Sequence, residues 1–331
     1  MTYDDLRETA VRPGLVWGFD FAEGRAWPIS EVELLGPGTP RGFRWLHFNL
    51  ADQRTARWLA AHRPVSAAAT ELLLSTDNSQ RAEVEADALA LVLHDFELDF
   101  IESEPRVGVL RIAASPSMIV TARRHPLRCA EAVKRRLDAG ATPSSPADAL
   151  ELIFAGMIDG FRAKTVELEA QVQAIEDELL KDRPATDART FTTLRSLMVR
   201  MHRMFGGARA ALRPLDEDGD VPQTLREPLA RHLGRLSSAD QDLMAVQGQL
   251  RLLRDEMDLH AAQQTNDNLY FLSILSALLL PATLVTGIFG MNTGGLPWTD
   301  HKLGSLWATV TALGSAGAVY LVLRLMGFIR R

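Results

Sequence analysis

The chain has 331 residues, 24% of them charged, and carries a formal net charge of −6. This negative charge, without a basic stretch interleaved with aromatic residues, argues against nucleic acid as a partner. The single cysteine, Cys129, excludes an internal disulfide and any zinc site built from several cysteines, as expected in a reducing compartment. The length is sufficient for one α/β domain together with long helices and membrane spans.

Strand-like runs dominate the first part of the chain. Two aromatic-rich runs, 14–21 and 43–50, are bounded by Gly and Pro, and apolar, β-favouring residues fill 84–100. Residues 107–112 and 118–121 predict a hairpin that turns at Ser115-Pro116.

Helix signals alternate with these strands. Asp52 is placed to cap a helix that runs through Arg63, and Pro126 opens a helix that contains Val133 and Leu137. The alternation predicts an α+β cytosolic domain with a layered α/β/α arrangement, although the strand order is not readable from the sequence.

From Ser145 onward the pattern is almost entirely helical. Ser145 followed by Pro146 predicts an N-cap and a first helical turn, with the helix continuing to about Lys181. A second helix is expected over residues 185–212, ending at Arg213-Pro214. Together they predict a long helical hairpin with coiled-coil character beside a stalk helix.

The third helix begins near Thr224, contains Pro228 in its first turn, and meets no further proline until Pro281. It is expected to be about 60 residues long, on the order of 90 Å, half in water and half in lipid.

Two stretches without charged residues predict membrane-spanning helices. No Asp, Glu, Lys or Arg occurs from Asn268 to Thr299 or from Leu303 to Leu323. Both stretches exceed the roughly 20 apolar residues that cross a hydrocarbon core of about 30 Å. The N-terminus has no signal-peptide pattern, and Arg324, Arg330 and Arg331 follow the second span. We therefore expect a multi-pass protein of the bacterial inner membrane with both termini in the cytosol.

The expected domain order follows from these boundaries. It is a cytosolic α/β domain (1–145), a helical hairpin and stalk helix (146–267), a first transmembrane helix (268–289), an outer loop (290–302), a second transmembrane helix (303–326) and a basic tail (327–331).

Most of the polar and small residues of the first span fall on one face of the helix, which we call the polar stripe. Their spacing alternates between three and four residues, so they lie above one another. Ordinary packing between membrane helices explains such a face, and so does the lining of a water-filled pore. Two spans cannot enclose a pore, so in the second case several chains must surround one axis. The stripe consists of Asn266, Leu269, Ser273, Ser276, Leu280, Thr283 and Gly287, with Leu272 beside Ser273.

The first span ends in Gly290-Met291-Asn292, and Thr293-Gly294-Gly295-Leu296-Pro297 follows. With Pro281 upstream, a short loop and a second span downstream, this sequence resembles the CorA superfamily of divalent cation transporters, whose signature is Gly-Met-Asn at this position. The resemblance covers the whole chain. It implies a funnel-shaped homopentamer that conducts a divalent cation and has no enzymatic activity.

The resemblance also assigns roles to residues. Gly290 lacks a Cβ and permits a tight turn after the helix. Asn292 becomes the selectivity residue at the pore mouth, where a ring of neutral oxygens holds a cation through its hydration shell. Thr283, Leu280, Leu272 or Ser273, Leu269 and Asn266 would line the path inward.

The continuation x-Gly-Gly-apolar-Pro is similar to the ZntB branch of the superfamily, which transports zinc. Magnesium-type members usually carry carboxylates just after the asparagine, where this chain has Thr293-Gly294-Gly295. We therefore expect Zn²⁺ to be transported, with Mg²⁺, Co²⁺ or Ni²⁺ as the alternative, and no tightly bound cofactor. The expected partners are further copies of the chain, membrane lipids and divalent cations.

A few residues outside the pore mouth are candidate metal ligands. By resemblance, Asp255 corresponds to an aspartate that binds metal in some CorA proteins, although an ordinary solvated acid explains it equally. His232 and His260 on the stalk and His301 in the outer loop are candidates for weak zinc ligands repeated by symmetry, beside structural or surface roles. No His-x-x-x-His pair or Cys cluster predicts a tight zinc site.

Two questions stay open at the level of sequence. Neither span contains Asp, Glu or His, so no residue is indicated for a proton relay, and the sequence decides neither the direction of transport nor its coupling to protons. A membrane-anchored coiled-coil sensor or scaffold is a distant alternative. The polar stripe and Gly-Met-Asn argue against it, because an anchor needs neither.

Overall fold

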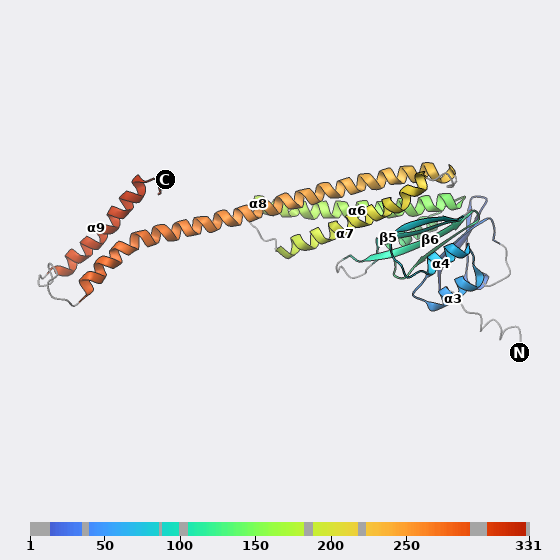
Figure 1. Cartoon of the computed structure of the whole chain (residues 1–331), viewed down its shortest axis with the longest axis horizontal. Helices are drawn as coiled ribbons and strands as arrows, with labels where there is room; N and C mark the ends of the chain where they lie inside the picture. The colour runs from blue at the N-terminus through green and yellow to red at the C-terminus, as the bar shows by residue number, and fades with distance from the viewer. Residues whose placement is uncertain are drawn as a thin grey trace. The chain divides into compact units, whose positions relative to one another are not determined.

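The computed structural model describes residues 14–34, 40–85, 88–98, 105–181, 188–217, 223–291 and 303–328 (Figure 1). The strands are β1 (Leu15–Ala22), β2 (Arg25–Pro28), β3 (Phe43–Asn49), β4 (Arg81–Glu85), β5 (Ala88–Phe96), β6 (Val107–Ser115) and β7 (Met118–Arg123). The helices are α2 (Glu31–Leu34), α3 (Gln53–His62), α4 (Ala67–Leu74), α5 (Arg128–Asp138), α6 (Pro146–Leu180), α7 (Ala188–Glu217), α8 (Gln223–Gly290) and α9 (Gly304–Leu325).

The strands form one mixed sheet in the order β2-β1-β3-β7-β6-β5-β4. Among the described strands, only β3 and β7 pair in parallel, and every other neighbouring pair is antiparallel. The predicted hairpin at Ser115-Pro116 is confirmed as β6 and β7. The strand-like stretch 84–100 contains all of β5 and the end of β4, and β2 and α4 were not predicted.

Helices cover both faces of the sheet, as the layered α/β/α prediction requires. Side chains alternate between the faces of a strand, and in β3 Leu46 and Phe48 point to a core under α3 and α4. Trp45 and His47 point the other way, toward Cys129 of α5 and Ile153 of α6. Asp52 caps α3 and Arg63 ends it in a left-handed conformation, as the sequence indicates.

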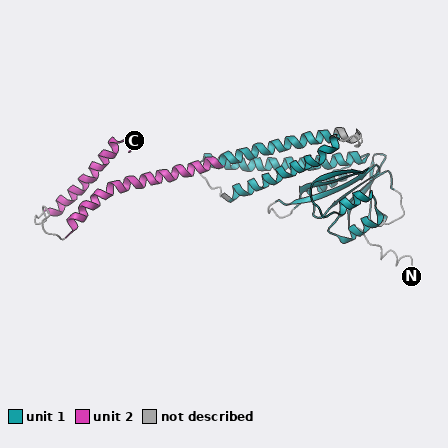
Figure 2. Ribbon diagram, viewed as in Figure 1, with its two compact units in different colours: residues 1–253 teal, residues 254–331 magenta. Residues whose placement is uncertain are grey.

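The three long helices pack on one another through apolar residues at helical spacing. On α8 these buried residues recur every three or four positions, the pattern of a coiled-coil seam. They are Leu236, Ala239, Leu243, Val246, Leu250 and Leu253. Ion pairs link α8 to α6 and α7, so residues 1–253 form one compact unit (Figure 2). The expected border at residue 145 therefore lies inside this unit.

The second long helix continues further than the sequence predicts. Pro214 was expected to end it near residue 212, but α7 passes through Pro214 and ends at Glu217. A proline costs one backbone hydrogen bond and a steric clash inside a helix. The burial of Leu215, which is 3% exposed, offsets this cost because its side chain packs at the junction of the long helices.

Residues 254–331 form the second compact unit, which contains the C-terminal part of α8 and all of α9 (Figure 2). Helix α8 is 68 residues long and unbroken at Pro281, slightly longer than the predicted helix of about 60 residues.

A buried carboxylate fastens α5 to the sheet. Asp95 of β5 is 1% exposed and accepts a hydrogen bond of 2.7 Å from the backbone N–H of Cys129, in the first turn of α5. Leu127, the N-cap residue, makes no side-chain capping bond, so Asp95 supplies the acceptor from another element. Burial raises the pKa of Asp95 to about 6, more than its backbone hydrogen bonds lower it.

This arrangement predicts a pH-dependent stability. The pKa of Asp95 is higher in the folded state than in the unfolded state, where it is near 4. The contribution of Asp95 to the free energy of unfolding is therefore largest below pH 4. It decreases by up to roughly 3 kcal/mol as pH rises through about 6. Asp95→Asn removes the charge and keeps an acceptor, so the variant should match wild type near pH 4 and exceed it at pH 7. Thermal unfolding of the full chain in detergent at pH 4 to 7 measures this difference. A variant that is less stable at pH 7 than wild type would refute the assignment.

Candidate ion pathway

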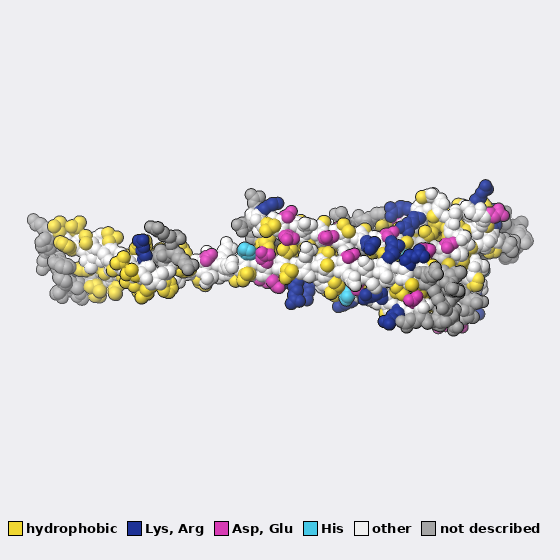
Figure 3. Space-filling model, turned by 90° about the horizontal axis from the view of Figure 1, so that it is seen from above, with side chains coloured by type: hydrophobic (Ala, Val, Ile, Leu, Met, Phe, Trp, Pro, Cys, Tyr) yellow, Lys and Arg dark blue, Asp and Glu magenta, His cyan; other side chains and the backbone are white. Residues whose placement is uncertain are grey.

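Two helices of the second unit are long and apolar enough to cross a membrane. They are the C-terminal part of α8 and the whole of α9, and almost none of their apolar surface is buried within the chain. Phe271 is 69% exposed and Leu284 is 63% exposed. A core helix of a soluble protein would bury such residues. In Figure 3 hydrophobic side chains dominate the visible surface of this unit, whereas charged side chains are spread over the other unit.

The polar stripe lies on an uninterrupted stretch of α8. Leu269 and Leu280 are 57% and 72% exposed, so no other part of the described chain covers this face. The hydroxyl of Ser273 donates to the carbonyl of Leu269 at 2.8 Å, and that of Thr283 donates to the carbonyl of Leu279. These bonds satisfy the hydroxyl protons inside the helix and leave oxygen lone pairs free to accept hydrogen bonds from water.

The outer end of the stripe is open. At Gly287 and Gly290 an added Cβ would meet no atom within 4 Å, so both leave room beside the helix. Gly290 is the last residue of α8, and the N–H of Met291 donates to the carbonyl of Ile288 at 3.2 Å. Asn292 and His301 lie outside the described residues, as does the rest of the loop 292–302.

Comparison with known proteins identifies this arrangement. The family model described as CorA-like Mg²⁺ transporter protein matches residues 40–325. The chain belongs to the CorA-like family. It is therefore a divalent cation transporter of the membrane and not an enzyme, as the resemblance in the sequence implied.

Relatives and solved structures span the same length. The divalent cation transporter CmaX of Pseudomonas aeruginosa is 23% identical over 93% of this chain and 94% of its own length. The zinc transport protein ZntB of Pectobacterium carotovorum is 23% identical over 85% and 86%. The complete structure of the CorA magnesium transporter from Methanocaldococcus jannaschii shares the fold with a TM-score of 0.80 at 14% identity, covering 95% of this chain and 98% of that one.

The remaining candidate ligands of this CorA-like chain do not converge. Within the described residues, no group of three or more His, Cys, Asp or Glu side chains is arranged to hold a metal ion. Asp255 and His260 are both exposed on α8. His232 is buried, at 2% exposure, between α8 and α6, so it does not present its ring to solvent as a stalk ligand would.

The structure reveals two ionic clusters that the sequence did not indicate. Asp159 of α6 pairs with Arg136 of α5 at 2.7 Å and with Arg235 of α8 at 3.2 Å. Asp240 of α8 pairs with His202 at 2.7 Å and with Arg209 at 2.9 Å, both from α7. These contacts join residues far apart in sequence, and no local motif marks them. They connect the long helices to one another and to α5.

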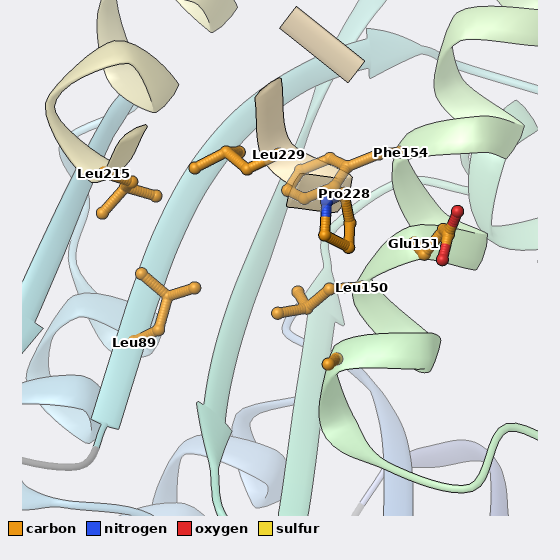
Figure 4. Close-up of a pocket in the computed structure, with 8 residues that line it drawn as sticks. Leu89, Leu150, Glu151, Phe154, Leu215, Pro228 and Leu229 are labelled. Atoms are coloured by element: carbon orange, nitrogen blue, oxygen red, sulfur yellow. The ribbon is translucent and has the colours of Figure 1, made fainter. Parts of the chain in front are cut away.

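Two hollows lie among the long helices. A small apolar pocket of about 20 Å³ forms where β5, α6, α7 and α8 meet, and Figure 4 shows Leu89, Leu150, Leu215 and Leu229 pointing toward one another there. It has room for little more than one water molecule, so it is a packing gap rather than a solute site. The second is a groove of about 660 Å³ between α6 and α8, lined by Arg162, Thr165, Val166, Glu169, Ala239, Asp242, Ala245, Val246 and Gln249.

The polar stripe predicts a hydrophobic constriction at Leu280. If rings of leucine close the path by excluding water, Leu280→Asn should hydrate the constriction. A barrier lowered by about 1.4 kcal/mol raises flux roughly tenfold. Metal flux into proteoliposomes measures it, with Leu275→Asn as a control because Leu275 lies on the opposite side of the helix. Equal flux through the Leu280→Asn variant and wild type would mean that Leu280 does not face the ion path.

Proposed function

We propose that this protein carries Zn²⁺ across the bacterial inner membrane through a homopentameric pore lined by the polar stripe of α8, with both termini in the cytosol. The observation that carries the proposal is the stripe itself. It is continuous along a membrane-spanning helix, no described part of the chain covers it, and it ends at Gly290-Met291-Asn292. Packing against another helix would also use such a face, but no described helix of the chain covers it, and an ion path needs one.

The sequence of the pore mouth is more similar to the zinc branch of the family than to its magnesium-type members. Thr293-Gly294-Gly295 provides no carboxylate beside Asn292, so cations are held by neutral oxygens and retained water rather than by a charged ring. Several relatives are named as zinc transport proteins. The second candidate is magnesium, supported by the description of the family model and by the solved magnesium transporter that shares the fold.

The proposed assembly of several chains is supported by apolar side chains on the surface of residues 1–253, which we call the soluble unit. Four of its exposed large apolar residues lie on α6 and α8, and one of them, Val166, lines the groove. The spacing of the polar stripe also continues toward the N-terminus through Ala262, Leu259, Asp255 and Leu252. Leu252 and Leu259 are 69% and 59% exposed. An unbroken heptad face of this kind is what helices arranged around one axis require.

The selectivity residue provides the main test. Asn292→Ala removes one hydrogen-bonding oxygen in each subunit, about 1 kcal/mol per bond and several when summed over a ring. We expect zinc flux into proteoliposomes to fall by about a hundredfold or more, while the oligomer stays intact. Asn292→Asp adds a charge per subunit and should tighten zinc binding and slow release.

The controls separate the ion and the site. Thr293→Ala, next in the sequence, should keep wild-type flux. Measuring Zn²⁺ and Mg²⁺ in parallel, with and without a pH gradient, decides between the two candidate ions. Normal zinc flux through Asn292→Ala would show that selectivity does not reside at the family signature.

If the groove between α6 and α8 belongs to the interface between subunits, a charge placed in it should weaken the oligomer. Val166 is 63% exposed, and Val166→Asp would place an unpaired carboxylate against a neighbouring subunit, at a cost of about 2–5 kcal/mol per interface. The matched control is Val16→Asp, at a residue of β1 that is 42% exposed. Light scattering in detergent should give the mass of five chains for wild type and Val16→Asp, and a smaller mass for Val166→Asp. If all three have the same mass, the groove is not part of the interface.

A further inference from the structure

His232 occupies an unusual position for an ionisable residue. Its side chain is 2% exposed and lies between α8 and α6, with its ring 5.6 Å from that of Phe154. Neither ring nitrogen has a hydrogen-bond partner in the part of the chain that the structure describes. Even a neutral imidazole carries one N–H, and leaving it unpaired in the interior costs about 1–3 kcal/mol. An apolar residue would fit this position better, so packing alone does not explain the histidine.

The charged groups around His232 are already paired with one another. On α6, Glu151 accepts from Arg231 at 3.0 Å and Asp159 accepts from Arg235 at 3.2 Å. Arg136 of α5 also pairs with Asp159 at 2.7 Å. Burial lowers the pKa of His232, and this effect outweighs the carboxylates of Glu151 and Asp159, which raise it, while Arg235 and Arg231 lower it further. No described carboxylate accepts a hydrogen bond from the ring of His232, so an imidazolium here would have no direct ion-pair partner among the described residues.

The histidine lies beside the anchor of the longest helix. Figure 4 shows Pro228 and Leu229, one turn earlier on α8, next to Leu150 and Phe154 of α6. Helix α8 runs without interruption from these first turns to Gly290. The turns that contain His232 and the polar stripe therefore belong to one helix.

We propose that His232 is a proton sensor: when its ring is protonated, the first turns of α8 around residues 228–236 separate from α6. Protonation places two N–H donors and a full charge in a pocket where the described residues provide no hydrogen-bond acceptor, which the docked state cannot accommodate. In the separated state the ring is hydrated and titrates normally. A consequence for ion flux rests on the proposed function, but the sensor itself does not.

The direction of the effect follows from proton linkage. The docked state binds the proton more weakly than the separated state. The docked state is therefore favoured most above the ordinary histidine pKa of about 6.5, and less as pH falls below it. One proton changes the docking equilibrium by at most about tenfold per pH unit. The ion pairs of Glu151 and Asp159 with arginine are the same in wild type and in His232→Leu, so an effect that they cause would be present in both proteins.

Hydrogen exchange on the full chain in detergent tests the proposal. Protection factors, corrected for the intrinsic effect of pH, are measured for peptides covering residues 226–240 at pH 7.5, 6.5 and 5.5. In wild type they should fall by up to about tenfold between pH 6.5 and 5.5. His232→Leu should keep them constant over this range, and His232→Lys should give low protection at every pH. His260→Leu is the control because it removes an exposed histidine from the same helix, and it should behave as wild type.

The proposal can be overturned with the wild-type protein alone, whether or not a variant folds. Wild-type protection that is constant with pH would exclude the sensor. So would a fall of equal size in His232→Leu, because another group would then be responsible. No metal or flux enters the measurement, so its failure leaves the transport proposal untouched, and the Asn292 variants can fail without affecting the sensor.

Discussion

The structure depends on one helix, α8, whose first half is suited to water and whose second half is suited to lipid. Over its first half, α8 buries a seam of apolar residues against α6 and α7 and exposes polar residues to water. Over its second half the pattern inverts, because apolar residues lie on the surface and several polar residues, among them Ser273, Ser276 and Thr283, share one stripe. A helix satisfies all its internal backbone hydrogen bonds, which is what allows the same chain to continue from water into lipid without a break.

The proposed ion path uses neutral chemistry throughout. Hydroxyl groups of Ser273 and Thr283 bond back to the helix. In the proposed pore Leu269 would supply an apolar ring before Ser273, and Leu280 would supply another between Ser273 and Thr283. Strong ligands would hold a divalent cation too tightly to release it, whereas hydroxyl, amide and apolar groups act on the hydrated ion. The charges of the protein are instead concentrated in its soluble unit, where they dock helices on one another.

The buried ionisable groups of that unit respond to pH in opposite directions. Burial lowers the pKa of His47 to about 3, and its Nδ1 lies 2.8 Å from the hydroxyl of Thr121. His47 therefore stabilises the fold above pH 6.5 and less so as pH falls. Asp95, with its raised pKa, has the opposite dependence. Such groups are costly in a core, and their presence beside α5 and α6 makes the soluble unit responsive to protons, with His232 at the point where α8 is docked.

The sequence by itself determined the features that depend on local or periodic patterns. The two spans follow from long uncharged runs, the caps Asp52 and Ser145 from the chemistry of helix starts, and the family from Gly290-Met291-Asn292 in its context. Only the tertiary structure decided the parallel pairing of β3 with β7, the continuation of α7 through Pro214, and the burial of His232 against Phe154. Each of these depends on contacts between residues distant in the chain, such as the packing of His232 against Phe154, and such contacts leave no mark in any single stretch of sequence.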